Sequence, residues 1–321
     1  MKKTVALVLA IAMIALSTLF MFSCNNGGTS DEKFTVGVCQ LVQHSALDLA
    51  TKGFIETLKA EFGDKVEILE QNASGDANVC NTIVSDFVTK NVDLIMANAT
   101  PALQAAYNAT ETIPILGTSI TEYGVALGVT LNNGVVGGNV SGTSDLASLE
   151  GQANMILEVC PDVKTVGIVY CSAEPNSLYQ VQEVKKFLAA KNVTVKVFPF
   201  ADSNDISPVV TLACESSDAL YIPTDNTAAS CAETIGNIVR EFKKPVFAGE
   251  ENLGKICGVA SLSISYYDLG VQTGMMAIKI LKGEANVSTM AIEYAPAAKK
   301  FNKNMCDLLG ITVPSNYEEM N

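Results

Sequence analysis

Short apolar runs alternate along the chain with longer segments whose apolar residues recur every three or four positions. The short runs predict buried strands, and the recurring pattern predicts amphipathic helices. Strands that alternate with helices form parallel sheets with right-handed crossovers. We expect strands at 34–41, 66–70, 92–97, 164–170, 194–198, 219–222, 246–248 and 259–263, and helices at 45–62, 146–159 and 266–281. A further helix is expected where the apolar residues Val79, Ile83, Val84 and Phe87 recur at helical spacing.

Two helix starts carry local signals. Ser45 stands three residues before Asp48, which is the spacing of a capping box and predicts that the Ser45 side chain caps a helix. Pro101 follows Thr100, and proline is favoured at the first position of a helix. Both signals come directly after a predicted strand, as expected for an α/β fold.

The strand pattern of the first half of the chain returns in the second half, displaced by about 130 residues. The corresponding segments are 36–38 and 166–168, 66–69 and 195–198, 93–101 and 218–226, and 113–116 and 244–247. A near-constant displacement indicates duplication. We therefore expect an α/β fold of two similar lobes, each a parallel sheet flanked by helices, joined by hinge strands. In such sheets, ligands bind beyond the carboxyl ends of the strands.

The lobe boundaries follow from this repeat. We assign 34–140 and about 265–288 to lobe 1, and 141–264 with part of 289–321 to lobe 2. The glycine-rich segment 117–139 has little periodicity, and we expect it to lead the chain out of lobe 1.

The first residues are typical of an export signal. Lys2 and Lys3 precede an apolar run at 4–22, and Cys24 follows Ser23. This pattern resembles a bacterial lipoprotein signal at 1–23, in which Cys24 would carry the lipid and 24–33 would be a polar tether. A transmembrane anchor and ordinary signal cleavage are the alternatives, because an apolar run of this length is almost long enough to span a bilayer.

Charge and cysteine content exclude several functions. With a net charge of −13, the 321-residue chain repels nucleic acid, and we expect no nucleic-acid partner. It has nine cysteines but no C-x-x-C pair, so no zinc or redox motif is predicted. Most of these cysteines lie in apolar segments and should pack as small apolar side chains, with one or two disulfides as the alternative.

Nothing in the sequence predicts an enzyme. A catalytic triad would need His44, the single histidine, and no G-x-S-x-G elbow accompanies it. Phosphate-loop, H-E-x-x-H and G-x-G-x-x-G motifs are also missing from the sequence. We therefore expect no catalytic residues, no cofactor and no metal site.

With these elements in place, the chain resembles the substrate-binding lipoproteins of ABC importers, in the branch that includes binders of tryptophan and other aromatic amino acids. The residues that carry the resemblance are 36–40, 44–48, 71–76, 99–106, 142–145, 222–227, 266–274 and 280–283. The resemblance implies a type I periplasmic-binding-protein fold, capture of the ligand between two closing lobes, and an ABC permease and ATPase as partners. It also implies an extracytoplasmic protein anchored in the membrane by its lipid. We expect a monomer.

We hypothesise that the ligand is a free aromatic amino acid. Such a zwitterion needs donors for its carboxylate and acceptors for its ammonium group. Thr100 and Ser119 follow strands of lobe 1 and are candidates for the carboxylate, at or near helix N-termini. Asp225 and Glu250 follow strands of lobe 2 and are candidates for the ammonium group, with Asn226 to orient it. Helix capping is the alternative role for Thr100 and Asp225, and a solvated acidic pair is the alternative for Glu250.

Further candidates come from loops and shared motifs. The ligand-contact candidates are His44, Asn176 and Ser177, which start helices after strands, and Gln40 and Ser144, which belong to the shared motifs. The aromatic candidates for a ring slot are Tyr123, Tyr170, Tyr179, Phe247 and Tyr266, each of which is otherwise expected in the core. A nucleoside or sugar ligand and a sensory module are the alternative functions.

Overall fold

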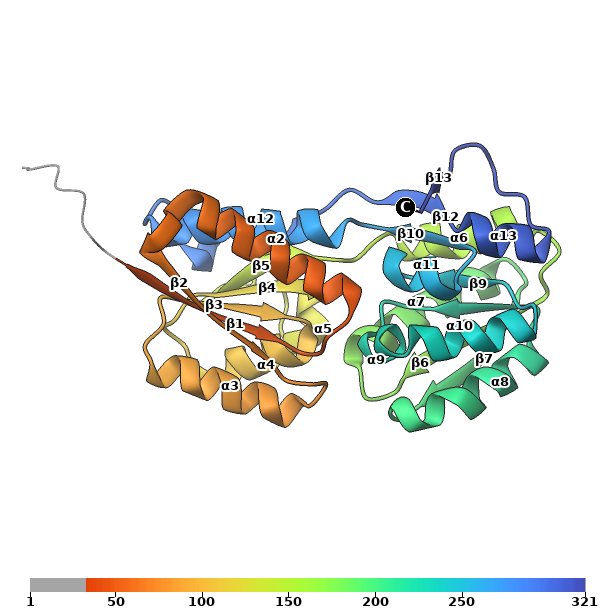
Figure 1. Ribbon diagram of the computed structural model, residues 1–321, viewed down its shortest axis with the longest axis horizontal. Helices are drawn as coiled ribbons and strands as arrows, with labels where there is room; N and C mark the ends of the chain where they lie inside the picture. Colours follow the sequence, from red (N-terminus) through yellow and green to blue (C-terminus); the bar gives the residue numbers. More distant parts are fainter. Residues whose placement is uncertain (1–32, 321) are drawn as a thin grey trace, which may run out of the picture. The chain divides into compact units, whose positions relative to one another are not determined.

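The computed structural model describes residues 33–320. This part of the chain contains two separate sheets, each covered by helices on both faces (Figure 1). The predicted signal peptide at 1–23, Cys24 and the tether up to residue 32 lie outside the described residues. The prediction of two similar α/β lobes is confirmed.

The first lobe is built on a six-stranded sheet in the order β11-β5-β4-β3-β1-β2. Its pairings are all parallel. Helices α2 and α12 pack together on one face, and α3 and α4 pack together on the other. The strands are β1 (Phe34–Gln40), β2 (Val66–Asn72), β3 (Leu94–Asn98), β4 (Ile115–Ile120), β5 (Val140–Ser144) and β11 (Glu293–Tyr294). The helices are α2 (Ser45–Phe62), α3 (Ala77–Thr89), α4 (Thr100–Ala109), α5 (Tyr123–Leu127) and α12 (Tyr266–Leu281), with 3-10 turns at Gly63–Lys65 and Val287–Thr289.

The second lobe repeats this arrangement in a seven-stranded sheet, β13-β12-β10-β9-β8-β6-β7. The order β8-β6-β7 matches β3-β1-β2, as duplication predicts, and β12 is the strand that runs antiparallel, against β10. The strands are β6 (Thr165–Cys171), β7 (Thr194–Phe200), β8 (Ala219–Ile222), β9 (Val246–Ala248), β10 (Ala260–Ser263), β12 (Ala298–Phe301) and β13 (Glu318–Glu319). The helices are α6 (Leu149–Val159), α7 (Pro175–Ala190), α8 (Ile206–Ser216), α9 (Asn226–Ser230), α10 (Ala232–Glu241), α11 (Glu251–Cys257) and α13 (Lys303–Leu309), with a 3-10 turn at Ser203–Asp205.

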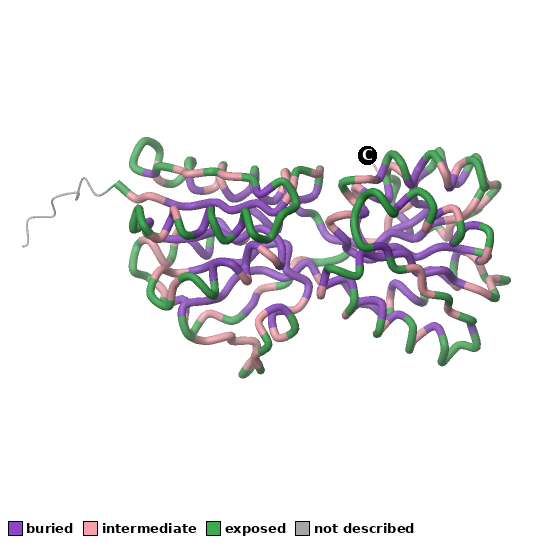
Figure 2. Tube along the Cα trace, turned by 90° about the horizontal axis from the view of Figure 1, so that it is seen from below, coloured by how far each residue is buried: buried purple, intermediate pink, exposed green. Residues whose placement is uncertain are grey.

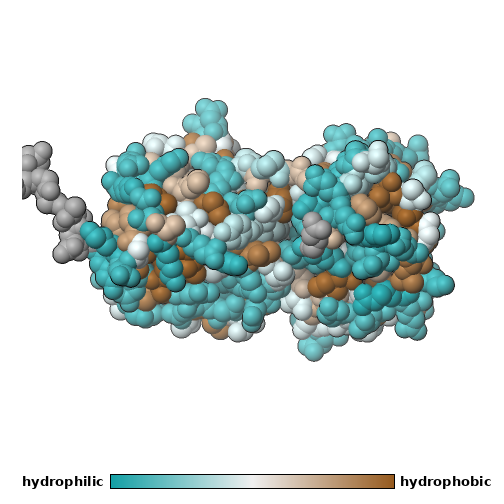
Figure 3. All heavy atoms as spheres, turned by 45° about the horizontal axis from the view of Figure 1, so that its top comes forward, coloured by the Kyte–Doolittle hydropathy of each residue, from teal (hydrophilic) through white to brown (hydrophobic). Residues whose placement is uncertain are grey.

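Burial follows the layers. The central strands of both lobes are buried almost throughout, whereas the outward faces of the helices are exposed (Figure 2). The face seen in Figure 3 is mainly hydrophilic over both lobes, with apolar residues in small groups. The helix expected around Val79 and Phe87 is α3, in which Val79 is 39% exposed because Cys80, Ile83, Val84 and Phe87 are the buried residues. In the described residues, no helix is both long enough and apolar enough to cross a membrane.

Three segments connect the lobes. They are 145–148 between β5 and α6, 264–265 between β10 and α12, and 295–297 between β11 and β12. The first crossing lies a few residues beyond the expected boundary at 140, because residues 140–144 pair with β4 as a strand of lobe 1.

The glycine-rich segment 117–139 does not leave lobe 1, contrary to expectation. It contains the end of β4, helix α5 and a loop that returns to β5. The close approach of β4 and β5 requires glycine: a Cβ at Gly142, in β5, would lie 2.1 Å from the carbonyl oxygen of Gly117, and Gly142 has a φ of +144°. The Tyr123 hydroxyl lies 3.0 Å from the carbonyl oxygens of Gly117 and Thr143, so this ring is core.

Candidate functional site

A small cavity lies where the carboxyl ends of strands from both lobes face each other. Its volume is about 10 Å³, which is room for about one water molecule. A larger ligand therefore requires the lobes to separate about the three crossings. The lining residues are His44, Leu47, Ser119, Thr121, Asp145, Asn176, Thr224, Asp225, Asn226, Ala229, Glu250 and Tyr266.

Four polar atoms that line this cavity are buried and have no hydrogen-bond partner. They are Nδ1 of His44, Oγ of Ser119, Oδ1 of Asp145 and Oδ1 of Asn176. Buried polar atoms are nearly always hydrogen-bonded in folded proteins, because leaving one unpaired costs about 1–3 kcal/mol. Such a group of donors and acceptors, drawn from both lobes and a crossing, is suited to a polar ligand.

Asp145 is the carboxylate with spare acceptor capacity. It lies in the first crossing and is 5% exposed, and its Oδ2 atom accepts a hydrogen bond from the Tyr266 hydroxyl at 2.8 Å. Its other oxygen is the unpartnered one. Burial raises the pKa of Asp145, against the lowering effect of its hydrogen bonds. We did not predict Asp145 as a site residue, although it directly follows Ser144 in a shared motif.

Asp225 uses both oxygens within the protein. Oδ1 accepts from the backbone N–H of Ala228 at 2.8 Å and caps α9, and Oδ2 accepts from the N–H of Cys171 at 2.6 Å. The side chain is 2% exposed, and burial, followed by the nearby charge of Glu174, raises its pKa to about 8. The geometry thus gives Asp225 the capping role that was the alternative to ligand contact.

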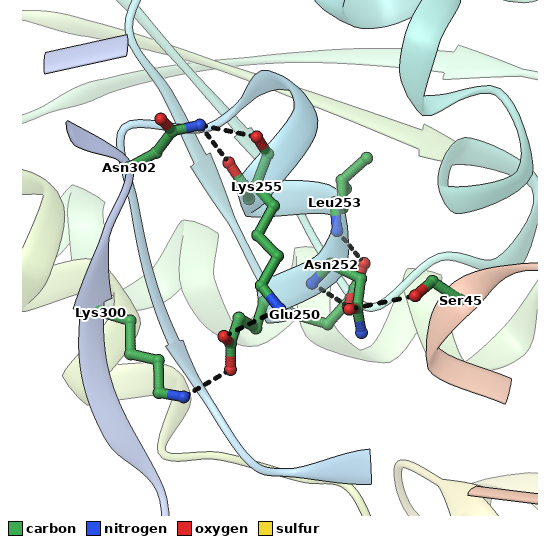
Figure 4. A network of polar contacts seen from close by, with 9 residues as sticks. Ser45, Glu250, Asn252, Leu253, Lys255, Lys300 and Asn302 are labelled. Atoms are coloured by element: carbon green, nitrogen blue, oxygen red, sulfur yellow. Dashed lines mark hydrogen bonds and ion pairs between the residues drawn. The ribbon is translucent and has the colours of Figure 1, made fainter. Parts of the chain in front are cut away.

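Glu250 has the same arrangement at the start of α11 (Figure 4). Its Oε2 accepts from the N–H of Asn252 at 2.6 Å, and Oε1 accepts from the N–H of Leu253. Burial raises the pKa of this carboxyl to about 7. The neighbouring Glu251 pairs with Lys300 at 2.7 Å and with Lys255 at 3.3 Å, so α11 is also tied to strand β12.

Glu174 holds the start of α9 and was not predicted. Its two oxygens accept from the backbone and side chain of Asn226, from the backbone and side chain of Thr227, and from Nδ2 of Asn176, at 2.8–3.1 Å. Nδ2 of Asn176 also donates to the Thr224 carbonyl at 3.1 Å. These contacts aim Oδ1 of Asn176 at the cavity without a partner.

Polar contacts join the lobes around the cavity. Nε2 of His44 lies 3.3 Å from Oδ1 of Asn226, and the hydroxyls of Thr121 and Thr224 are 3.4 Å apart. Burial lowers the pKa of His44, so its imidazole is neutral at neutral pH. The lobes are therefore in contact on both sides of the cavity.

The predicted capping role of Ser45 is wrong. His44 is the N-cap residue of α2, and no side chain caps that end. Ser45 Oγ instead donates to Oδ1 of Asn252 in the other lobe at 3.2 Å (Figure 4). The Ser45 hydroxyl, which the sequence pattern predicts as a cap of α2, thus forms a hydrogen bond across the cleft instead.

Six of the predicted site residues line the cavity: His44, Ser119, Asn176, Asp225, Asn226 and Glu250. Four lie outside its lining: Gln40, Thr100, Ser144 and Ser177. Gln40 links β1 to α2 through Asp48 at 2.7 Å and Thr51 at 2.6 Å.

The other three, Thr100, Ser144 and Ser177, have structural positions around the cavity. Thr100 is the first residue of α4, after an N-cap at Ala99 that has a φ of 88°. Ser144 Oγ donates to the Thr121 carbonyl at 2.9 Å and accepts from the Leu146 N–H at 3.1 Å, which shapes the first crossing. Ser177 Oγ lies 3.5 Å from the carbonyl oxygen of Thr224.

Of the five aromatic candidates, Tyr266 lines the cavity, and the others belong to or pack against the hydrophobic cores. Within residues 33–320, no cluster of three or more His, Cys, Asp or Glu side chains is arranged to hold a metal ion. All eight cysteines in this range are free thiols.

The fold and site define a class: two parallel-sheet lobes that meet over a buried polar cavity, as in binding proteins of the type I periplasmic fold. The chain belongs to the ABC transporter substrate binding protein family, whose model matches residues 35–319.

Similar proteins come from several bacteria. A tyrosine-binding protein of Clostridioides difficile is 34% identical over 88% of this chain and 85% of its own. An ABC domain of Streptococcus pneumoniae, solved in complex with L-Trp, is 33% identical, with a TM-score of 0.85 over 90% of this chain and 99% of its own. A ligand-free, open substrate binding protein with adhesive properties from Clostridium difficile is 35% identical, with a TM-score of 0.68 over 89% of this chain and 98% of its own.

These two solved structures differ in TM-score although their identities to this chain are nearly equal. By TM-score, this chain is more similar to the structure solved with L-Trp than to the open one. Polar contacts also cross its own cleft.

Proposed function

We propose that this protein captures a free aromatic amino acid outside the cytoplasm and delivers it to an ABC permease and ATPase. The observation that carries the ligand class is the cavity between the lobes. Its lining contains three carboxylates and several hydroxyl and amide groups but neither Lys nor Arg. The ammonium group of a ligand would pair with these carboxylates. The carboxylate of the ligand would accept hydrogen bonds from the hydroxyl and amide donors.

Asp145 is the proposed partner of the ammonium group, because its Oδ1 is buried and unpartnered whereas the oxygens of Asp225 and Glu250 accept backbone N–H groups. An opposite charge at hydrogen-bond distance stabilises an ionised carboxylate against the cost of burial. Ser119 is the proposed donor to the ligand carboxylate, since its hydroxyl is also unpartnered.

The aromatic class rests on relatives. Two proteins that are 33% and 34% identical to this chain are described as complexed with L-Trp and as tyrosine-binding. The polar cavity supports the amino-acid part of the proposal, and the relatives support the aromatic part.

Export and anchoring complete the proposal. Lys2, Lys3 and the apolar run before Cys24 support lipid attachment at Cys24. The lipid would hold the two lobes of a monomeric protein at the membrane surface. Labelling growing cells with a lipid precursor tests this point, and Cys24→Ser should remove the label. Label retained by that variant would contradict lipidation at Cys24.

Thermal unfolding with a ligand panel tests the function. Ligand at about 100 times its dissociation constant should stabilise the fold by about 2.7 kcal/mol. L-tyrosine or L-tryptophan should raise the melting temperature, whereas N-acetyl-L-tryptophan, which lacks the ammonium group, should not. Stabilisation by a nucleoside or a sugar alone would contradict the proposal, as would equal stabilisation by the acetylated analogue.

A further inference from the structure

Two buried cysteines of lobe 1 face each other between strand β1 and helix α3. Cys39 lies in β1 and Cys80 lies near the start of α3, and both side chains are 0% exposed. Their thiols share a hydrogen bond, which raises the pKa of Cys39 and lowers the pKa of Cys80. The two sulfur atoms are therefore direct neighbours, although the chain between them contains α2 and β2.

The packing of α3 on β1 explains this contact. A Cβ at Gly37 would lie 2.5 Å from the ring of Phe87, so the helix sits directly on the strand at that point. Gly37 and Cys39 belong to one face of β1, because side chains alternate along a strand. Phe87 and Cys80 belong to one face of α3, because they are about two helical turns apart. The same packing thus places Cys80 over Cys39.

Three other buried cysteines use their thiols differently. The Sγ atoms of Cys171, Cys257 and Cys306 donate to backbone carbonyl oxygens at 3.3–3.5 Å. Such thiols behave as small core groups with a weak donor. The thiols of Cys39 and Cys80 point to each other instead, which is the arrangement that a disulfide needs.

We propose that Cys39 and Cys80 form a disulfide when the protein folds outside the cytoplasm. The inference rests on the proposed export of the chain, because disulfides form and persist in oxidising extracytoplasmic compartments. The oxidant is a disulfide carried by a small molecule or by another protein, which accepts two electrons and becomes two thiols.

The bond forms in two exchange steps. Cys80 is the better first nucleophile, because the start of a helix favours a thiolate and its pKa is lowered. The Cys80 thiolate attacks one sulfur of the oxidant and releases the other as the first thiol. The Cys39 thiolate then attacks Sγ of Cys80 and releases the second thiol. The protons of the two protein thiols end on the two released thiols.

The disulfide would join the end of β1 to the start of α3, where the backbone already makes a tight connection. The N–H groups of Ala73 and Gly75, in the loop before α3, donate to the carbonyl oxygens of Gln40 and Leu41 at 2.9 and 2.8 Å. A bond beside them would close a loop that contains α2 and β2. Closing such a loop restricts the unfolded chain, so the oxidised protein should be more stable than the reduced protein.

Thiol mapping of the exported protein tests the pairing. Cells that produce the full chain are acidified to trap thiols, and the unfolded protein is alkylated with N-ethylmaleimide and digested without reductant. Mass spectrometry should find the peptide of Cys39 joined to the peptide of Cys80, and reduction should separate them. Alkyl groups on both cysteines, or a bond from either of them to another cysteine, would overturn the proposal.

Export and pairing fail in different ways. Protein that stays in the cytoplasm would overturn the proposed export, and refolding then decides the pairing. Reduced protein that is refolded with oxidised glutathione should form the same bond between Cys39 and Cys80. Refolded protein in which both remain thiols would overturn the disulfide and leave the proposed amino-acid capture intact.

The melting temperature measures the effect of the bond. Wild-type protein refolded with reductant should melt at least about 3 °C below the oxidised protein. Cys80→Ala should lose this difference, whereas Cys214→Ala, which removes a buried thiol from α8 in lobe 2, should keep it. A difference that persists in Cys80→Ala, or is lost in Cys214→Ala, would overturn the proposal. Should Cys80→Ala fail to fold, the peptide map of the wild type decides alone.

Discussion

Replacing Asp145 with asparagine separates a ligand-binding role from a structural one, because the two roles predict opposite effects. Asp145→Asn keeps the size of the side chain and an oxygen that accepts from Tyr266, but it removes the charge. The carboxylate is 5% exposed, and one of its oxygens has no partner. Its charge therefore contributes little to the ligand-free fold.

The affinity should fall steeply. Loss of one partner from a buried, hydrogen-bonded charge pair costs about 2–5 kcal/mol, which corresponds to a loss of about 30-fold to several thousand-fold in affinity. Tyr266→Phe is the matched control, since it removes the hydroxyl that orients Asp145 and keeps the charge. Its effect should be close to one hydrogen bond, about 0.5–1.5 kcal/mol.

The stability of the ligand-free protein should move the other way. Burial raises the folded-state pKa of Asp145. Such a group stabilises the fold below its unfolded pKa, and this contribution is lost as pH rises through the folded pKa. At pH 8 the free energy of unfolding of Asp145→Asn should therefore equal or exceed that of the wild type. Calorimetric titration with L-tryptophan and urea unfolding measure the two effects. A change in affinity below about threefold in a folded variant would refute the reasoning.

Three further predictions concern the frame of the site. Asp225→Ala should lower the free energy of unfolding by about 2 kcal/mol or more in urea unfolding, because it removes a helix cap and leaves buried N–H groups unpaired; unchanged stability would contradict the capping role. Glu250 has its pKa raised to about 7, so the ligand-free protein should lose stability between about pH 4.5 and pH 7, and denaturation at several pH values should show a shallower slope for Glu250→Gln. Ala99→Gly should raise the free energy of unfolding by about 1 kcal/mol, because Ala99 has a φ of 88° and a ψ of 159°, a region that glycine favours. Ala102→Gly, inside the same helix, should lower it by about 1 kcal/mol, and a loss in both variants would show that Ala99 is not strained.

The two-lobed α/β fold could be predicted from the sequence because its strand signals are local and repeated. Apolar runs and the displacement of about 130 residues located the strands of both lobes, and parallel sheets bring strand ends to one edge. His44, Ser119 and Asp225 were found in this way and do line the cavity. The return of the chain from Gly117 to Gly142 was missed, because a close backbone approach leaves no periodic pattern.

The individual roles could not be read from the sequence, because they depend on which hydrogen bonds the backbone itself uses. Asp145 and Asp225 both follow strands, and no local pattern shows that backbone N–H groups occupy both oxygens of Asp225 whereas Oδ1 of Asp145 has no partner. Thr100 was predicted to contact the ligand, but it lies outside the lining of the cavity. Its helix starts from an unusual backbone conformation at Ala99, which the sequence pattern did not show.

Asp145 also links the proposed ligand site to two of the segments that connect the lobes. Asp145 lies in the first crossing and accepts a hydrogen bond from the Tyr266 hydroxyl. Tyr266 is the first residue of α12, directly after the second crossing. A ligand ammonium group at Oδ1 would contact both crossings through one side chain. The interaction would then be strongest when the lobes are closed, which is the differential affinity that ligand-driven closure requires.

Calorimetric titration of the ligand-stripped protein, residues 25–321, with L-tyrosine and L-tryptophan tests the central claim most directly. Stripping by unfolding and refolding removes any amino acid that is carried through purification. We predict saturable binding of one aromatic amino acid per protein, with no heat signal from N-acetyl-L-tryptophan. A correctly refolded protein that binds neither amino acid would contradict the account, and the family assignment would then stand without this ligand.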